Sequence, residues 1–226
     1  DQSLSELRRQ LERQPGPVQS GSYGTRHGPT ALEQAPPLTA NTSPGTLKPF
    51  CGRPGVVYAI APSPIEANIL WAGTDDGLIH QTRDGGKTWQ AMGLPDSHHI
   101  ARIVIHPKNP DIVYVAAMGH LFSKNEERGV FRTMDGGKTW KKVLYINDGV
   151  GAIDLVINQK TPTQVFAALY DKERFPWEIR ESGPESGVYR TDDGGEKWTR
   201  LTNGLPSDKI GRIGLDLYQK NPLILY

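Results

Sequence analysis

The sequence has almost no cysteine, no long apolar run and no excess of charge of either sign. Its single cysteine, Cys51, excludes an internal disulfide, a thiolate zinc cluster and a paired redox motif. No apolar stretch approaches the roughly 18 residues that a membrane-spanning helix needs. Lysine and arginine number 26 against 25 aspartate and glutamate residues, so net charge provides no attraction to nucleic acid. We therefore expect no transmembrane segment and no nucleic-acid partner.

Glycine and proline, in contrast, are plentiful, with 25 and 18 of the 226 residues. This composition is typical of many short strands joined by turns. Eight of the prolines fall within residues 1–54, where Ser3 and Glu6, at capping-box spacing, accompany three leucines at helical spacing. For this first region we predict a short helix at about 4–13, followed by a Pro/Gly-rich linker that ends near residue 54.

From about residue 55 onward the sequence repeats. The stretch TRDGGKTW at 82–89 returns as TMDGGKTW at 133–140 and as TDDGGEKW at 191–198. The copies are 133 − 82 = 51 and 191 − 133 = 58 residues apart. Around each copy stand short apolar segments, four per unit. A repeat of this size with four strands per unit is typical of a β-propeller.

We therefore predict that residues 55–226 form an all-β domain of propeller blades, each with four antiparallel strands, A to D, of which A is innermost. The expected blades cover about 56–92, 100–145 and 151–202, and a partial blade covers 210–226. Three and a half blades are fewer than the roughly four to eight that close a ring. The expectation is thus a partial ring, completed by further blades or by other subunits.

The repeated motif falls between strands C and D and is predicted to fasten that turn. Its aspartate accepts hydrogen bonds from the turn, its glycines adopt positive φ, and its tryptophan packs on the next blade. A calcium loop needs about six oxygen ligands, whereas each copy supplies one placed carboxylate. We therefore expect no metal and no other cofactor. The motif residues are Thr82, Asp84, Gly86 and Trp89; Thr133, Asp135, Gly137 and Trp140; and Thr191, Asp193, Gly195 and Trp198.

The motif resembles the Asp-box, or bacterial neuraminidase repeat, of pattern Ser/Thr-x-Asp-x-Gly-x-x-Trp, which occurs in sialidases, xyloglucan-cleaving glycoside hydrolases and sortilin-type propellers. The segment HPKNPDIVYVAAMGHLFSKNEERGVFRTMDGGKTW looks like secreted bacterial sortilin-like or "glycosyl hydrolase" repeat proteins, and this resemblance covers about 55–226. It implies a secreted, periplasmic or cell-surface location. The opening residues DQSLSELRRQ do not have the pattern of a signal peptide.

The long connections in this architecture are the B–C loops at 119–128 and 171–186, which are expected to lie on the face opposite the motif turns together with the D–A segments. Binding residues on rigid scaffolds collect in such loops. An aromatic side chain flanked by charge suits a sugar ring or a peptide side chain. The ligand-binding candidates are Trp177, Arg174, Arg180, Arg102, Arg212 and His120.

Each candidate also has a structural interpretation. Trp177 would then only pack its own loop, and the arginines would tie neighbouring blades together. Arg128, at the start of a strand C, is expected to be solvated or to lie between blades. The adjacent His98 and His99 would point apart on an extended strand, which does not favour a metal site.

Catalysis is the remaining question. Glycoside hydrolysis usually needs two carboxylates roughly 5 to 9.5 Å apart. The loops offer Glu126, Glu127, Asp171 and Glu178, but nothing in their spacing demands such a pair. A sialidase resemblance would imply a Phe/Tyr-Arg-Ile-Pro motif, which is absent, and a xyloglucanase resemblance would imply aspartates from two facing propellers. No catalytic residue carries over.

Three hypotheses follow. The first is a non-catalytic scaffold that recognises a protein, peptide or carbohydrate through its long loops. The second is part of a sialidase-like or xyloglucanase-like glycoside hydrolase. The third is a structural subunit of a larger assembly, attached through residues 1–54.

Overall fold

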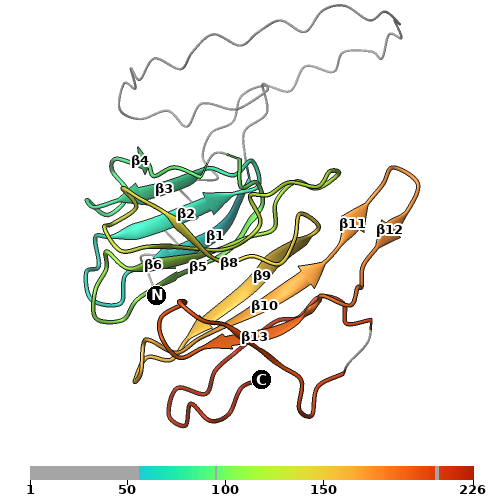
Figure 1. Ribbon diagram of the computed structural model, residues 1–226. Helices are drawn as coiled ribbons and strands as arrows, with labels where there is room; N and C mark the ends of the chain where they lie inside the picture. Colours follow the sequence, from blue (N-terminus) through green and yellow to red (C-terminus); the bar gives the residue numbers. More distant parts are fainter. Residues whose placement is uncertain (1–55, 95, 207–208) are drawn as a thin grey trace, which may run out of the picture. The chain divides into compact units, whose positions relative to one another are not determined.

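The structure, a computed structural model, describes residues 56–94, 96–206 and 209–226 (Figure 1). These residues all belong to one unit of the chain, Gly45–Tyr226. The helix and linker predicted for 1–54 lie outside the described residues. Within the described ranges, no helix has the length and hydropathy of a membrane span.

Three four-stranded antiparallel sheets follow one another along the chain, and we call them blades 1, 2 and 3. Blade 1 contains β1 (Val57–Pro62), β2 (Leu70–Thr74), β3 (Ile79–Thr82) and β4 (Gln90–Ala91). Blade 2 contains β5 (Ile100–Ile105), β6 (Val113–Ala117), β7 (Gly129–Thr133) and β8 (Lys141–Leu144). Blade 3 contains β9 (Val150–Ile157), β10 (Val165–Asp171), β13 (Gly187–Thr191) and β14 (Thr199–Leu201). The predicted all-β fold of four-stranded blades is confirmed.

Burial along the strands explains why the middle of each sheet is so apolar. Every residue of β6, β7 and β10 is buried, because blades lie against both faces of these strands. The outer strands are short and less buried: β4 is exposed, whereas most residues of β8 and β14 are partly buried. The continuous apolar runs of the sequence therefore correspond to strands covered on both sides.

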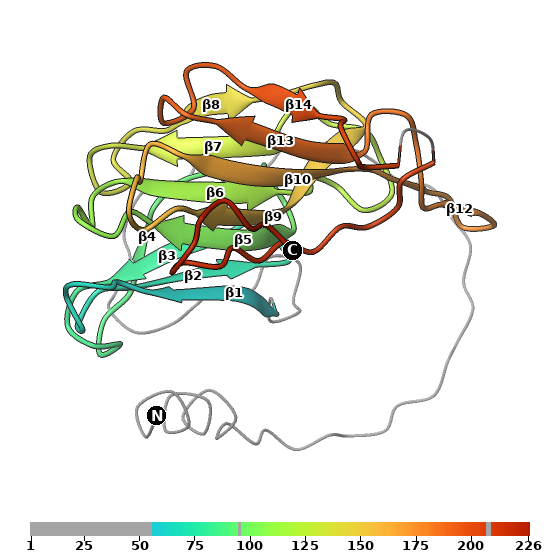
Figure 2. The same cartoon turned by 90° about the horizontal axis from the view of Figure 1, so that it is seen from below.

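The innermost strands lie next to one another: β1 is beside β5, and β5 is beside β9 (Figure 2). The hydrophobic core is divided between the blade interfaces. Trp71 and Phe131 pack between blades 1 and 2, and Tyr114 and Leu155 pack between blades 2 and 3. Stability is thus built from contacts between successive blades, as in other repeat architectures.

The last described residues, 209–226, begin a further blade. Asp216 and Tyr226 exchange two backbone hydrogen bonds of 3.0 and 2.8 Å, and an antiparallel bridge joins Leu217 to Leu225. Leu215 and Leu217 pack on blade 3 beside Phe166. The arrangement is that of three full blades and the start of a fourth, which agrees with the predicted partial ring.

The three copies of the repeated motif share one set of hydrogen bonds. In the second copy the Thr133 hydroxyl donates to Asp135 Oδ1 at 2.8 Å and accepts the N–H of Gly137 at 2.9 Å. The carboxylate also accepts the N–H of Thr139 at 2.9 Å. The other two copies repeat these three bonds at the same distances. The contacts of the aspartate lie within its own turn, which supports the interpretation of the motif as a fastener.

The first glycine of each motif anchors the C–D turn to the A–B turn of the same blade. Its N–H donates to a carbonyl of that turn at 3.0, 3.0 and 2.8 Å in blades 1, 2 and 3, the acceptors being Asn68, Asp111 and Thr163. Both kinds of turn therefore lie at one end of each blade. The B–C and D–A connections emerge at the opposite end, which we call the loop face.

The motif tryptophans of blades 2 and 3 pack on the preceding blade, and not on the next one as predicted. The Trp140 indole N–H donates to the Met92 carbonyl of blade 1 at 2.6 Å. Its ring meets Trp71 edge-on, with centroids 6.0 Å apart. Gly137 lies so close that a Cβ there would come within 2.7 Å of Trp71. The motif thus closes its own turn and also fits it against the neighbouring blade.

Candidate functional site

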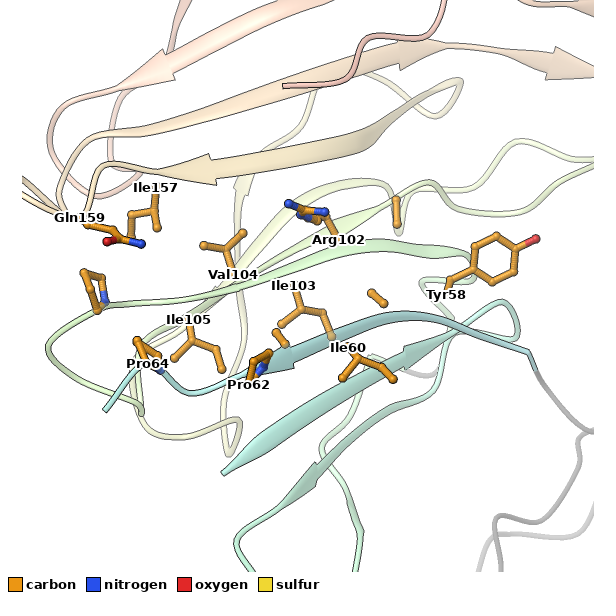
Figure 3. A pocket seen from close by; sticks show the side chains of 14 residues that line it. Tyr58, Ile60, Pro62, Pro64, Arg102, Ile103, Val104, Ile105, Ile157 and Gln159 are labelled. Carbon is orange, nitrogen blue, oxygen red and sulfur yellow. The ribbon is translucent and has the colours of Figure 1, made fainter. Parts of the chain in front are cut away.

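One hollow in the described part of the chain follows the innermost strands. This hollow, the channel groove, has a volume of about 450 Å³ and lies between β1 and β5 near the end of β9. Figure 3 shows Ile103 and Ile105 reaching from β5 towards β1. Most side chains of the described lining residues are apolar, and the one charged side chain among them, Arg102, lies 3.5 Å from Asp154 on β9. The channel groove is therefore a concave surface with few polar side chains that could bind or react with a ligand.

The second hollow, the loop-face cleft, opens on the loop face and has a volume of about 420 Å³. The B–C loops of blades 2 and 3 meet there with a D–A segment and with the inner strands. Its charged and imidazole side chains are His99, His120, Arg128, Lys172, Arg174, Glu181 and Arg212. Its apolar and aromatic walls are formed by Tyr58, Ala101, Met118, Leu121, Ile153 and Tyr170. Tyr58 and Ala101 also line the channel groove, so the two hollows adjoin.

Three of the predicted ligand-binding residues, Arg174, Arg212 and His120, line the loop-face cleft. Arg102 lines the channel groove instead. Arg180 and Trp177 belong to the hairpin formed by β11 (Glu173–Arg174) and β12 (Ile179–Arg180), which extends beyond the ends of β10 and β13 in Figures 1 and 2. The structure therefore brings half of the predicted set together.

The cleft carries an excess of positive charge. The Lys172 ammonium lies 5.8 Å from the centre of the Tyr170 ring, and the Arg174 guanidinium lies 5.4 Å from that of Phe122. Within the described ranges, Lys172, Arg174 and Arg212 take part in no ion pair. Glu181 is the one acidic residue among the described lining residues. The cations are thus available to a ligand.

Arg128 lines the cleft, and of the two alternatives expected for it, solvated or between blades, the first is wrong. Arg128 is only 3% exposed. The guanidinium donates to the carbonyls of His120 at 2.9 Å, Ser123 at 2.8 Å and Gly149 at 3.3 Å, and to Asn125 Oδ1 at 3.0 Å. All four acceptors are neutral. Burial lowers the pKa of Arg128, and the side chain folds the B–C loop of blade 2 around itself.

The histidines at the rim adopt an unexpected backbone. His98 and His99 have φ angles of 37° and 40°, in the left-handed region, and do not lie on an extended strand as predicted. The His98 ring meets His120 edge-on, with centroids 4.1 Å apart, whereas His99 Nδ1 lies 3.2 Å from the Gly119 carbonyl. Burial lowers the pKa of both adjacent histidines. Across the described residues, no three His, Cys, Asp or Glu side chains are grouped to hold a metal ion.

The acidic candidates do not form a pair across the cleft. Asp171 is buried, and its carboxylate lies 2.8 Å from Arg180, which also approaches Glu173 at 3.5 Å. Glu127 lies 3.7 Å from Lys142. Glu126 and Glu178 are exposed. None of the four lines the cleft as the structure describes it.

Trp177 is not buried in its loop, although its aromatic contact is within that loop. It is 80% exposed and stacks on Phe175, with ring centroids 5.7 Å apart and an interplanar angle of 11°. This pair forms an aromatic surface at the tip of the β11–β12 hairpin, outside the cleft.

Sequence reasoning missed several cleft residues. Lys172 lies in the loop that the sequence singled out, and its position beside Arg174 was a usable signal. Tyr58 gave no such signal, because it belongs to strand β1, which only the packing of the blades brings beside the connections that carry His99 and Glu181.

Comparison with known proteins agrees with the propeller. The Sortilin-Vps10 family, described as "Sortilin, neurotensin receptor 3", matches residues 53–178. A probable oligoxyloglucan-reducing end-specific xyloglucanase of Neosartorya fischeri is 27% identical over 212 residues, covering 92% of this chain and 22% of that protein. The chain therefore spans about a fifth of this relative's length.

Solved structures of similar fold include two described as GH74 enzymes. An ancestral GH74 enzyme has a TM-score of 0.63 at 18% identity, covering 83% of this chain and 23% of that one. The GH74 enzyme of Niastella koreensis has a TM-score of 0.55 at 19% identity, covering 72% and 23%. At such low identity these likenesses concern the fold alone. Because the family match extends over more than half of its residues, the chain belongs to the Sortilin-Vps10 family of β-propeller proteins.

Proposed function

We propose that this chain is part of an extracytoplasmic recognition scaffold that binds a protein, peptide or glycan at its loop-face cleft. The observation that carries the proposal is the cleft itself, a hollow of about 420 Å³ where long loops meet around side chains free to contact a ligand. A concave site with a few convergent polar groups on a rigid scaffold is the usual form of a binding site. A secreted, periplasmic or cell-surface location is part of the proposal and is supported by the resemblance to secreted repeat proteins.

Binding arrays test this proposal. The 226-residue chain and its Arg174→Ala variant would be applied to arrays of peptides and glycans, with Lys108→Ala as the matched control. Lys108 is an exposed cation of the A–B turn in blade 2, at the end of the blade opposite to the cleft. We expect at least one ligand class that Arg174→Ala loses and Lys108→Ala retains. If no ligand distinguishes the Arg174 variant from the parent, the cleft is not the recognition site.

A second function is favoured by one specific observation, the 27% identity to a probable xyloglucanase over 92% of this chain. The chain would then be part of a glycoside hydrolase. Because its acidic candidates are ion-paired or lie outside the cleft, this function would depend on carboxylates that the described residues do not bring together.

Hydrolysis assays separate the two functions. The complete protein would be incubated with a panel of glycosides that includes xyloglucan oligosaccharides, in parallel with variants of the acidic candidates. The variants are Glu126→Gln, Glu127→Gln, Asp171→Asn and Glu178→Gln. Absence of hydrolysis together with retained ligand binding supports the scaffold. Hydrolysis by the parent that a single variant abolishes would support the enzyme and identify its acid.

A further inference from the structure

The charged side chains of the loop-face cleft are almost all cations. Lysine and arginine offer N–H groups and no acceptor, and four of them line the cleft: Arg128, Lys172, Arg174 and Arg212. The described lining contains no serine, threonine, asparagine or glutamine. We propose that this cleft selects acidic peptide segments in which carboxylate side chains alternate with apolar ones. The inference rests on the proposed function and names the ligand class of the same site.

The hydrogen-bonding pattern favours a carboxylate over a sugar hydroxyl. An ionised carboxylate is acceptor-only, so each contact that it makes with the lysine and arginine side chains of this cleft is a charge-assisted hydrogen bond. A hydroxyl also donates a proton, and the described lining side chains offer few acceptors for it: the Glu181 carboxylate, the Tyr58 and Tyr170 hydroxyls and the unprotonated ring nitrogens of the two histidines. A polyhydroxylated ligand would meet the lysine and arginine side chains only with neutral oxygens, whereas a carboxylate would form the stronger hydrogen bonds in which both partners are charged. The charges and hydrogen-bond donors of the cleft are therefore more complementary to an anion than to a neutral glycan.

The positive potential of the cleft has two sources. Lys172, Arg174 and Arg212 face the hollow without an ion pair in the described ranges. Arg128 adds a charge that its neutral oxygen partners do not cancel. The nearby Asp148 and Glu173 favour its charged form but do not pair with it. In a partly buried site such a potential is screened less by salt than at an open surface.

The walls of the cleft account for the apolar part of the ligand. Tyr58 is 61% exposed beside Met118, Leu121 and Ile153. These side chains present carbon surface next to the cations, so an apolar residue adjacent to a carboxylate would gain burial at the same time as its neighbour gains hydrogen bonds. A simple inorganic anion would use only half of this site.

Fluorescence anisotropy with a matched pair of peptides tests the inference. The labelled probe would alternate Glu with Leu, and its twin would alternate Gln with Leu. We expect the 226-residue chain to bind the Glu peptide at least about tenfold more tightly than the twin, with affinity that weakens severalfold from about 50 to about 500 mM NaCl. Lys172→Gln, Arg174→Gln and Arg212→Gln should each weaken binding about five- to tenfold.

Control variants separate charge from folding. Lys108→Gln, in the A–B turn of blade 2, should bind as the parent does, and Lys172→Arg should retain most of the affinity. Glu181→Gln should bind the Glu peptide as tightly as the parent or more tightly, because it removes the acid in the lining. Thermal unfolding would show that each variant is folded.

Three results would overturn the inference: equal affinity for the two peptides, cleft variants that bind like Lys108→Gln, or a preference for an oligogalacturonate competitor over the Glu peptide. The proposed function is tested separately. If the arrays still yield a neutral peptide or glycan that Arg174→Ala loses, recognition stands and the selection for acidic peptides fails. If no ligand binds at all, both fail.

Discussion

The motif aspartates are held ionised by their own turns. Hydrogen bonds from the Thr139 hydroxyl and N–H, and from the Thr133 hydroxyl, lower the pKa of Asp135 to about 2. An aspartate in an unfolded chain titrates near about 3.9. Because the pKa is lower in the folded state, ionised Asp135 stabilises the fold above about pH 4. That contribution is lost as the pH falls from about 4 through about 2.

This linkage gives a prediction for Asp135→Asn. The variant should be less stable than the parent at about pH 7, and its stability should fall less steeply between about pH 4 and pH 2. Denaturant unfolding followed by tryptophan fluorescence at several pH values would measure both. Glu66→Gln, at an exposed residue of blade 1, is the control and should leave the pH dependence unchanged. An Asp135→Asn variant with the same loss of stability in acid as the parent would contradict the fastener interpretation.

A glycine of the same motif sets how closely two blades approach. Gly137 has a φ of 90°, and a Cβ there would lie 2.7 Å from Trp71. Gly137→Ala should destabilise the protein by about 2 to 4 kcal/mol, from backbone strain together with overpacking. Gly204→Ala is the matched control, since φ there is 75° and nothing lies within 4 Å. Equal losses of unfolding free energy for the two variants would show that strain alone matters.

At the scale of elements, the B–C loop of blade 2 is organised around a buried cation. Arg128→Gln removes donors that hold the His120, Ser123 and Gly149 carbonyls. We expect faster hydrogen exchange across residues 119–127 and only a minor change in β6 and β7. Lys124→Gln, in the same loop, should have little effect, because that side chain is 56% exposed and its Asp148 partner lies 3.8 Å away. Unchanged exchange in Arg128→Gln would refute this role.

The same loops show how far the sequence determines the structure. The motif letters and the apolar runs predicted the C–D turns and the buried strands, because turn chemistry and burial act over a few residues. The loop conformations were not predicted. Arg128 is at the start of a strand and gives no local sign that it folds back under its own loop. The turn-forming residues at 95–97 precede His98 and His99, but they do not specify that both histidines adopt the left-handed region.

The cleft is less predictable still. Arg174 was predicted to bind ligand because it lies in a long loop, and Arg212 because it lies at the start of a strand A. Arg180, from the same loop as Arg174, is instead paired with Asp171. Whether a loop cation faces a hollow or a neighbouring carboxylate depends on how the blades pack. The sequence repeat predicts the order of the blades. It does not predict which side chains from different blades meet in the loop-face cleft.

At the scale of the whole molecule, the division of the hydrophobic core among the blade interfaces implies that each blade depends on its neighbours for stability. The described core residues fall into clusters at successive blade interfaces. In repeat architectures each unit is stabilised chiefly by its neighbours. Loss of a contact at one interface should therefore act first on the blades that share it.

Leu217→Ala tests this idea at the last interface. Leu217 is 3% exposed and packs on blade 3 with Phe166 and Val188, so truncation should destabilise that interface by about 2 to 4 kcal/mol. Hydrogen exchange should increase in residues 209–226 and in β10 and β13, while β2 and β3 of blade 1 keep the protection of the parent. Leu223→Ala, at a residue that is 93% exposed, should change neither region. A uniform increase in hydrogen exchange along the whole chain would instead mean that the blades unfold as one cooperative unit. A defect at the last interface would then lower the protection of blade 1 as much as that of blade 3.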